Sequence, residues 1–206
     1  MQANTTGSYN TAYGSSALRA NTTASYNTAV GYQAADANTT GQLNVAVGVG
    51  SLGANTIGST NTAIGTNALF YNTTANQNNA VGYTALFNNT TGAENAAFGY
   101  QAGKNNTTGL ANTFLGNVSG ELNTTGTRNT FVGHNSGQAM LTGSRNTILG
   151  RYTGNGGGLD IRTSSNNIVL SDGDGNPRVY DNGQALHIYA TSTMNVATNG
   201  HYLRAY

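Results

Sequence analysis

Apolar and polar positions alternate in short runs that return at a fixed interval along most of the chain. If the asparagine that opens each unit is position 0, an apolar residue stands at position 3 and a small or apolar residue at position 2. Side chains alternate between the two faces of a strand, so positions 2 and 3 lie on opposite faces of one short strand. A glycine at position 4 predicts a turn directly after that strand.

The interval is 17 residues, and nine copies of N-T-A-V-G-Y-Q-A-L-x-x-N-T-T-G-x-x follow one another without insertion or deletion. Helical-pair repeats are about twice as long, and Asn, Thr and Gly are poor helix formers. Seventeen residues suit two or three short strands, with successive coils pairing in parallel about 4.8 Å apart. The pattern therefore predicts an all-β fold, a parallel β-solenoid (β-roll) with one coil per repeat.

The asparagines at position 0, and a second asparagine column at position 11, are expected to stack as hydrogen-bonded amide ladders along the axis. The position-0 ladder consists of Asn10, Asn27, Asn44, Asn61, Asn78, Asn95, Asn112, Asn129 and Asn146.

Position 3 is always apolar, and we expect it to point inward as the structural core column. After Tyr13 in the first unit, this column consists of Val30, Val47, Ile64, Val81, Phe98, Leu115, Val132 and Leu149.

Positions 2 and 8 exchange volume along the chain. Position 2 is Ala in six units and then Phe114, Phe131 and Ile148, while position 8 changes from Leu or Ala to Gly at nearly the same point. Interiors keep a nearly constant packing density, so the two positions are predicted to share one compartment. With position 3 assigned to the interior, that compartment is expected to lie against a neighbouring subunit. Phe114, Phe131 and Ile148 are therefore predicted to pack a homotrimer.

The repeat register breaks after Gly150. We predict a solenoid domain over residues 1–154 and a small antiparallel cap or neck over residues 155–206, with strand-like runs at 168–170, 178–180 and 185–189. The open N-terminal coil is expected to abut another protein, because an uncovered edge invites aggregation.

Composition narrows the function. Charged residues make up 7%, the net charge is +1 and there is no cysteine. These values exclude a disulfide scaffold, a cysteine-ligated zinc site and a nucleic-acid binder that works by phosphate neutralisation. No apolar stretch approaches the roughly 20 residues that span a bilayer, so membrane insertion is not expected.

Catalysis is not expected either. Glycan cleavage needs two carboxylates about 5–10 Å apart, but Asp36, Glu94 and Glu121 are spread over distant coils or different positions of the coil. No catalytic triad order and no phosphate-binding loop is present, and no cofactor is expected. A glycan depolymerase is therefore disfavoured.

A calcium-loop spacing occurs at Asp172, Asp174 and Asn176. The EF-hand pattern then requires Gly and later Glu, where this chain has Pro177 and Gly183. A plain turn is the favoured interpretation, and no metal site is predicted.

Two surface features suggest binding. Tyr32, Tyr83 and Tyr100 share position 5, where their rings either stack on the sugars of a host-surface glycan or pack between coils or subunits. Threonine columns at positions 12 and 13 leave an ice-binding β-solenoid as an alternative, although threonine is also an ordinary strand residue.

The phrase Asn61-Thr62-Ala63-Ile64-Gly65 and its relatives resemble the head repeats of trimeric autotransporter adhesins, which form a parallel β-roll in a homotrimer. The longer unit resembles still more closely the repeats of bacteriophage tail fibres. The segment 158–178 is similar to the stretch that such fibres carry before a self-cleaving chaperone domain. This likeness implies that Tyr206 is a processed end of a longer gene product and that the open N-terminal coil abuts another virion or fibre protein. The resemblance implies a structural fibre of a phage tail or comparable appendage, located in the virion, that attaches to a glycan or protein of the host surface. The alternative is the head of a bacterial trimeric adhesin at the cell surface.

Overall fold

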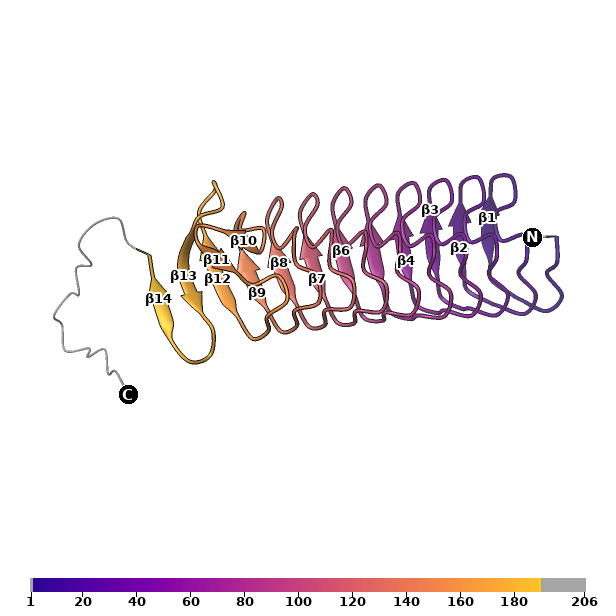
Figure 1. The fold of residues 1–206 in the computed structure, drawn as a ribbon. Helices are drawn as coiled ribbons and strands as arrows, with labels where there is room; N and C mark the ends of the chain where they lie inside the picture. Colours follow the sequence, from indigo (N-terminus) through magenta and orange to yellow (C-terminus); the bar gives the residue numbers. More distant parts are fainter. Residues whose placement is uncertain (1, 190–206) are drawn as a thin grey trace, which may run out of the picture.

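The computed structural model describes residues 2–189, which form a straight rod of stacked coils (Figure 1). Each coil contributes one three-residue strand to a continuous parallel sheet along one side of the rod. The strands of the nine repeats are β1 (Thr11–Tyr13), β2 (Thr28–Val30), β3 (Val45–Val47), β4 (Thr62–Ile64), β5 (Asn79–Val81), β6 (Ala96–Phe98), β7 (Thr113–Leu115), β8 (Thr130–Val132) and β9 (Thr147–Leu149).

The predicted fold class is confirmed: the chain is an all-β parallel solenoid with 17 residues per turn. The register between neighbouring strands is offset by one repeat throughout, for example Val47 opposite Ile64 and Ile64 opposite Val81. The prediction of two or three strands per coil is wrong, because the residues outside the strand form turns.

Left-handed backbone conformations build these turns. In the coil that starts at Asn78, φ is positive at Gly82, Thr84, Leu86 and Glu94, and the same positions recur along the rod. Position 4 requires glycine, because a Cβ on Gly82 would collide with the carbonyl oxygen of the glycine one coil later. The chain therefore reverses direction within few residues and closes a narrow coil.

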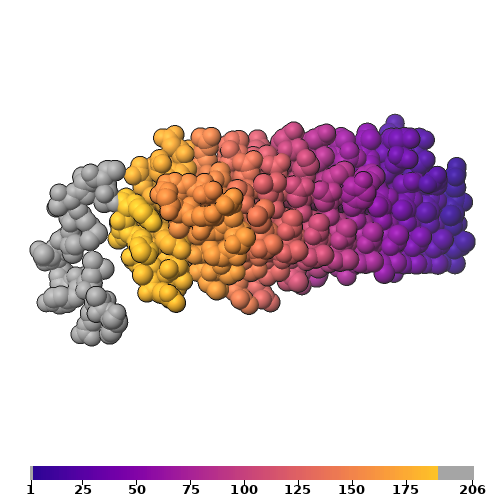
Figure 2. All heavy atoms as spheres, in the orientation of Figure 1, coloured from indigo at the N-terminus to yellow at the C-terminus, as the bar shows by residue number. Residues whose placement is uncertain are grey.

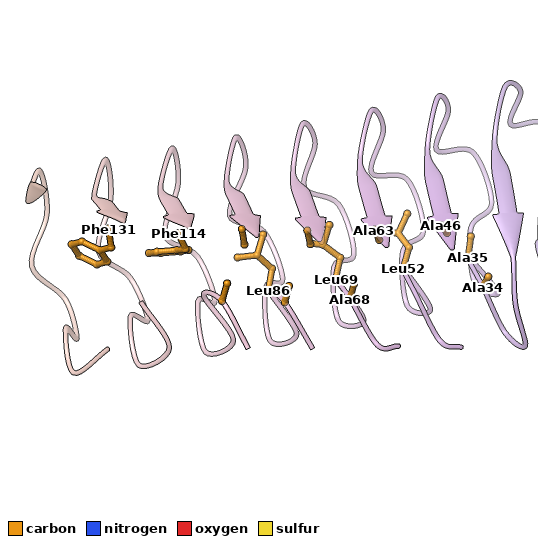
Figure 3. Packing of buried hydrophobic residues seen from close by; sticks show 14 of the residues in the cluster. Ala34, Ala35, Ala46, Leu52, Ala63, Ala68, Leu69, Leu86, Phe114 and Phe131 are labelled. Atoms are coloured by element: carbon orange, nitrogen blue, oxygen red, sulfur yellow. The ribbon is translucent and has the colours of Figure 1, made fainter. Parts of the chain in front are cut away.

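The interior of the coil holds positions 2 and 8, not position 3. Ala63, Leu69 and Leu86 are fully buried, and Figure 3 shows their side chains between the strands and the opposite turns. The predicted core column is therefore wrong: its residues lie on the outer face of the sheet. Val30, Val47, Val81 and Val132 are half-exposed there, and Ile64, Phe98, Leu115 and Leu149 are exposed.

The assignment of Phe114, Phe131 and Ile148 to a subunit interface is also wrong, because all three are fully buried inside their own chain. The Phe114 ring occupies the space that leucines at position 8 fill in earlier coils. A Cβ added to Gly103 or to Gly120 would collide with this ring. Positions 2 and 8 do share one compartment, and that compartment is the interior of the coil.

Two asparagine ladders run through the buried interior. At position 0, the Asn61 Oδ1 accepts a hydrogen bond from the Asn78 backbone amide at 3.0 Å, and its Nδ2 donates to the Ala75 carbonyl at 2.9 Å. At position 11, the Asn72 Nδ2 donates to the Asn55 Oδ1 at 2.9 Å. The amides thus pair backbone groups that would otherwise be buried without partners.

The solenoid extends past the predicted boundary at residue 154. β12 (Ile168–Ser171) pairs in parallel with β9, and Asn167 takes the ladder position 21 residues after Asn146 instead of 17. The additional residues form a small hairpin of β10 (Asn155–Gly156) and β11 (Leu159–Asp160). The parallel sheet therefore contains a tenth rung.

Antiparallel strands follow this tenth rung, as predicted. β13 (Pro177–Asp181) pairs with β12, and β14 (Leu186–Ile188) pairs with β13. Tyr206 lies outside the described residues. The space-filling view shows coils packed into a solid rod without hollows on the face in view (Figure 2).

Candidate functional site

The outer face of the sheet carries a continuous column of apolar side chains. Position 3 places one apolar side chain on this face in every coil. Leu170 of β12 extends the column with 39% of its surface exposed, and Leu115 is 46% exposed. Ten strands spaced about 4.8 Å apart make this column about 43 Å long. A continuous apolar column of this length is unusual on a monomeric soluble protein, since large exposed patches mark interaction sites.

Two exposed columns flank this face and vary from coil to coil. Position 16 precedes the strand and position 5 follows it, and neither is fixed by an interior contact. Their residues are Tyr9, Tyr26, Leu43, Thr60, Gln77, Glu94, Ala111, Arg128 and Arg145 at position 16, and Ser15, Tyr32, Val49, Thr66, Tyr83, Tyr100, Asn117, His134 and Arg151 at position 5. The buried ladder columns scarcely vary, so the fold leaves the flanking columns free to carry binding specificity.

The tyrosines predicted at position 5 are all about half exposed, but only two of them meet. Tyr83 and Tyr100 stack with their ring centroids 5.4 Å apart and an interplanar angle of 11°. Tyr32 is separated from them by the coils that carry Val49 and Thr66. The Tyr83–Tyr100 pair presents a flat, half-exposed aromatic surface of the kind that stacks on a sugar ring.

Sequence reasoning missed two further aromatic groups. Tyr9 and Tyr26 stack at 5.0 Å on position 16, and the shared position would have revealed them. Phe70, Tyr71 and Phe87 form a cluster at positions 9 and 10, with ring centroids 4.9 to 5.7 Å apart. This cluster lies over Gly50 and Gly53, whose missing side chains leave room for the Phe70 ring.

The threonine columns are unequal. At position 12 the hydroxyls donate to backbone carbonyls one coil away, as Thr22 does to Thr39 at 3.1 Å. At position 13 the side chains are exposed, but Ile57 interrupts the column. Of these two columns, only position 13 presents exposed threonine hydroxyls to the solvent.

The carboxylates serve local structure. Asp36 pairs with Arg19 at 2.9 Å, and the Glu121 carboxylate accepts a hydrogen bond from Gln138 at 3.0 Å. Asp172 accepts the backbone amide of Asn176 at 2.9 Å and also binds Arg178. These hydrogen bonds lower the Asp172 pKa from 3.8 to about 2, and the bond from the Asn176 backbone amide has the largest effect.

The segment with the calcium-loop spacing is a turn held by Asp172, the interpretation that the sequence favoured. Among residues 2–189, no group of three or more metal-ligating side chains comes together. Burial raises the pKa of the Tyr152 hydroxyl, which donates a 2.7 Å hydrogen bond to the Leu159 carbonyl. Tyr152 therefore fills the ninth coil as a structural residue.

Comparisons with known proteins assign the chain to no family. No protein-family model matches the chain, and neither the curated proteins nor the solved structures contain a match. No helix within residues 2–189 is both long and apolar enough to cross a membrane. The chain is therefore established as a β-solenoid repeat protein.

Proposed function

We propose that the chain is a segment of a homotrimeric fibre, in a phage tail or comparable appendage, that mediates attachment to the host cell surface. The observation that carries the proposal is the apolar column on the outer face of the sheet. Three copies with these faces turned toward a common axis would bury the column along the rod. The resemblance of the repeat to those of phage tail fibres and trimeric adhesins supports the same assembly.

The size of the face is adequate for a stable assembly. A strip about 43 Å long and roughly 15 Å wide, the width of a three-residue strand with its flanking side chains, covers about 650 Å² per chain. Three such strips turned toward one axis would bury roughly 1,950 Å² in all, an amount comparable with a specific protein interface. Register between copies would follow from matching the coils one to one.

Trimerisation also explains how a weak contact could hold a cell surface. Each chain carries one Tyr83–Tyr100 pair at the edge of the interface, so a trimer would present it three times. Sugar stacking on one pair is weak, but simultaneous engagement of several raises the overall affinity by orders of magnitude. The tyrosine pair is the proposed glycan contact.

The proposal is tested by the mass of the purified chain in light scattering after size exclusion. We expect a trimer. Phe98→Asp together with Leu115→Asp should give a folded monomer, because both side chains are exposed in the isolated chain but buried and charged in the trimer. Thr108→Asp with Thr125→Asp is the matched control, since it alters the exposed position 13 of the same two coils.

Circular dichroism should show the same spectrum for all three proteins. A folded monomer of the parent chain, or a trimer that survives Phe98→Asp with Leu115→Asp, would overturn the proposal. If the parent chain is a dimer that Phe98→Asp with Leu115→Asp dissociates and the control does not, the outer face is the interface but the three-fold arrangement is overturned.

A further inference from the structure

Basic residues stand at both ends of β8 and β9. Arg128 directly precedes the coil opening of β8 and His134 follows that strand, while Arg145 and Arg151 take the same places around β9. All four side chains are exposed. The flanking columns of the outer face, which are aromatic or neutral over most of the rod, thus become basic over these two coils.

No acid in the described part of the chain forms an ion pair with the three arginines of these two coils. Arg19, Arg162 and Arg178 each bind an aspartate at 2.6 to 2.9 Å. Within residues 2–189, Arg128, Arg145 and Arg151 take part in no such ion pair. The nearest acid on position 16 is Glu94, which lies two coils before Arg128.

The fold gains nothing from these arginines. Arg128 and Arg145 occupy equivalent places on adjacent coils, about 4.8 Å apart along the rod, where like charges repel. Their φ angles are 56° and 57°, in the left-handed region that favours glycine and asparagine. Asn166 occupies the same position in the next coil. Neither pairing nor backbone preference therefore accounts for arginine here.

We infer that the basic edges of the outer face at β8 and β9 bind an acidic polysaccharide. The guanidinium group offers a planar fork of donors that matches carboxylate and sulfate oxygens. Charges repeated on successive coils fit a polymer that carries repeated anionic groups.

The homotrimer completes the site, and to this extent the inference rests on the proposed function. When three outer faces surround an axis, the position-16 edge of one chain adjoins the position-5 edge of the next. Arg128 and Arg145 of one chain would then face the His134 and Arg151 side chains of a second copy. A bound polyanion would neutralise this concentration of like charge in the groove between subunits.

A single-stranded nucleic acid is a poorer fit. Proteins that bind single strands combine a basic groove with aromatic side chains on which the bases stack. The flanking positions of these two coils hold Arg128, His134, Arg145 and Arg151, with no Phe, Tyr or Trp among them. Tighter binding of a single-stranded nucleic acid is therefore treated as an outcome that would contradict the inference.

The experiment measures binding of the full 206-residue chain to immobilised dextran sulfate and polygalacturonate, with neutral dextran as the blank. We expect binding to both charged polymers that weakens as salt rises. Arg128→Gln with Arg145→Gln should reduce the affinity roughly tenfold or more, since two charge-assisted contacts are lost. The matched control, Lys104→Gln with Arg162→Gln, removes the same charge elsewhere and should retain the affinity within about twofold.

Light scattering of each variant separates this inference from the proposed function. A trimeric parent that binds neither polymer at low salt overturns the inference and leaves the fibre proposal standing. Equal losses in the two double variants, or tighter binding of an oligothymidylate of equal charge, also overturn it. A monomeric parent that still loses affinity with Arg128→Gln and Arg145→Gln supports the polysaccharide site and overturns only the trimer.

Discussion

The exchange of volume between positions 2 and 8 gives the most demanding test of the interior. Phe114 is fully buried, and its ring takes the space above Gly103 and Gly120. In the first six coils the same compartment holds an alanine and, in most coils, a leucine. Phe114→Ala should therefore open a cavity, Gly120→Leu should collide with the ring, and the double variant should restore the earlier packing.

The magnitudes follow from the atoms involved. Phe114→Ala alone should cost about 3–5 kcal/mol, which lowers the melting temperature of a chain of this size by roughly 6–20 °C. Gly120→Leu alone should cost about 1–3 kcal/mol through overpacking. The double variant has two side-chain carbons fewer than the parent, so at about 0.8 kcal/mol per carbon it should cost only about 1.6 kcal/mol. Leucine fits the backbone there, since Leu86 has φ 50° and Gly120 has φ 61°.

Thermal unfolding followed by circular dichroism at a fixed scan rate and protein concentration ranks the four proteins. The decisive result is the order: the double variant should melt above Phe114→Ala, although it carries one more substitution. If it melts as low as the sum of the two single changes predicts, positions 2 and 8 do not share the interior of the coil and the packing argument is refuted.

Two further expectations concern hydrogen bonds. Asn61→Ala should cost about 1–3 kcal/mol in thermal melts, because the buried Asn78 backbone amide loses its acceptor, whereas the Ala75 carbonyl keeps the hydrogen bond from Asn72. Asn79→Ala, at an exposed position of the next coil, should change stability by less than about 0.5 kcal/mol, and equal effects would contradict the ladder. The Asp172 pKa is lowered from 3.8 to about 2. The ionised carboxylate should therefore stabilise the turn fully above about pH 4, and this stabilisation should be lost as the pH falls through 2. An Asp172 carboxyl resonance that titrates near 3.8 in NMR would disprove this.

The period, the parallel coil and the ladder positions could be predicted because the same residue types recur at the same positions of every repeat. The inward face could not be assigned from alternation alone. Alternation places positions 2 and 3 on opposite faces of the strand but does not show which face lies inside the coil. An apolar column on the outer face, with residues such as Ile64 and Leu115, has the same pattern as a core. The better signal was the exchange of volume at Phe114 and Gly120, because only a closed interior requires constant filling.

Other features escaped because their residues carry no local mark. Thr84, Leu86 and Glu94 adopt a positive φ in the turns, although these residue types rarely do so. The predicted number of strands per coil was therefore too high. The hairpin inserted in the ninth coil moved Asn167 out of register and hid the tenth rung. The basic edge around β8 and β9 emerges only when charges are compared by their position in the coil and by their partners.

Each asparagine in the position-0 ladder bonds only within its own coil and to the adjacent coils, as Asn61 does to Ala75, Asn44 and Asn78. The length of the rod can therefore change without a change in these contacts. Removing residues 61–77 would set the Asn44 Oδ1 against the amide of Asn78, and Val47 opposite Val81, which are the same kinds of partners as before. Stability in such arrays is approximately a sum over neighbouring units. Loss or duplication of one 51-nucleotide segment would therefore shorten or lengthen the rod by about 4.8 Å and create no new surface, so reach can change by recombination while the fold stays the same.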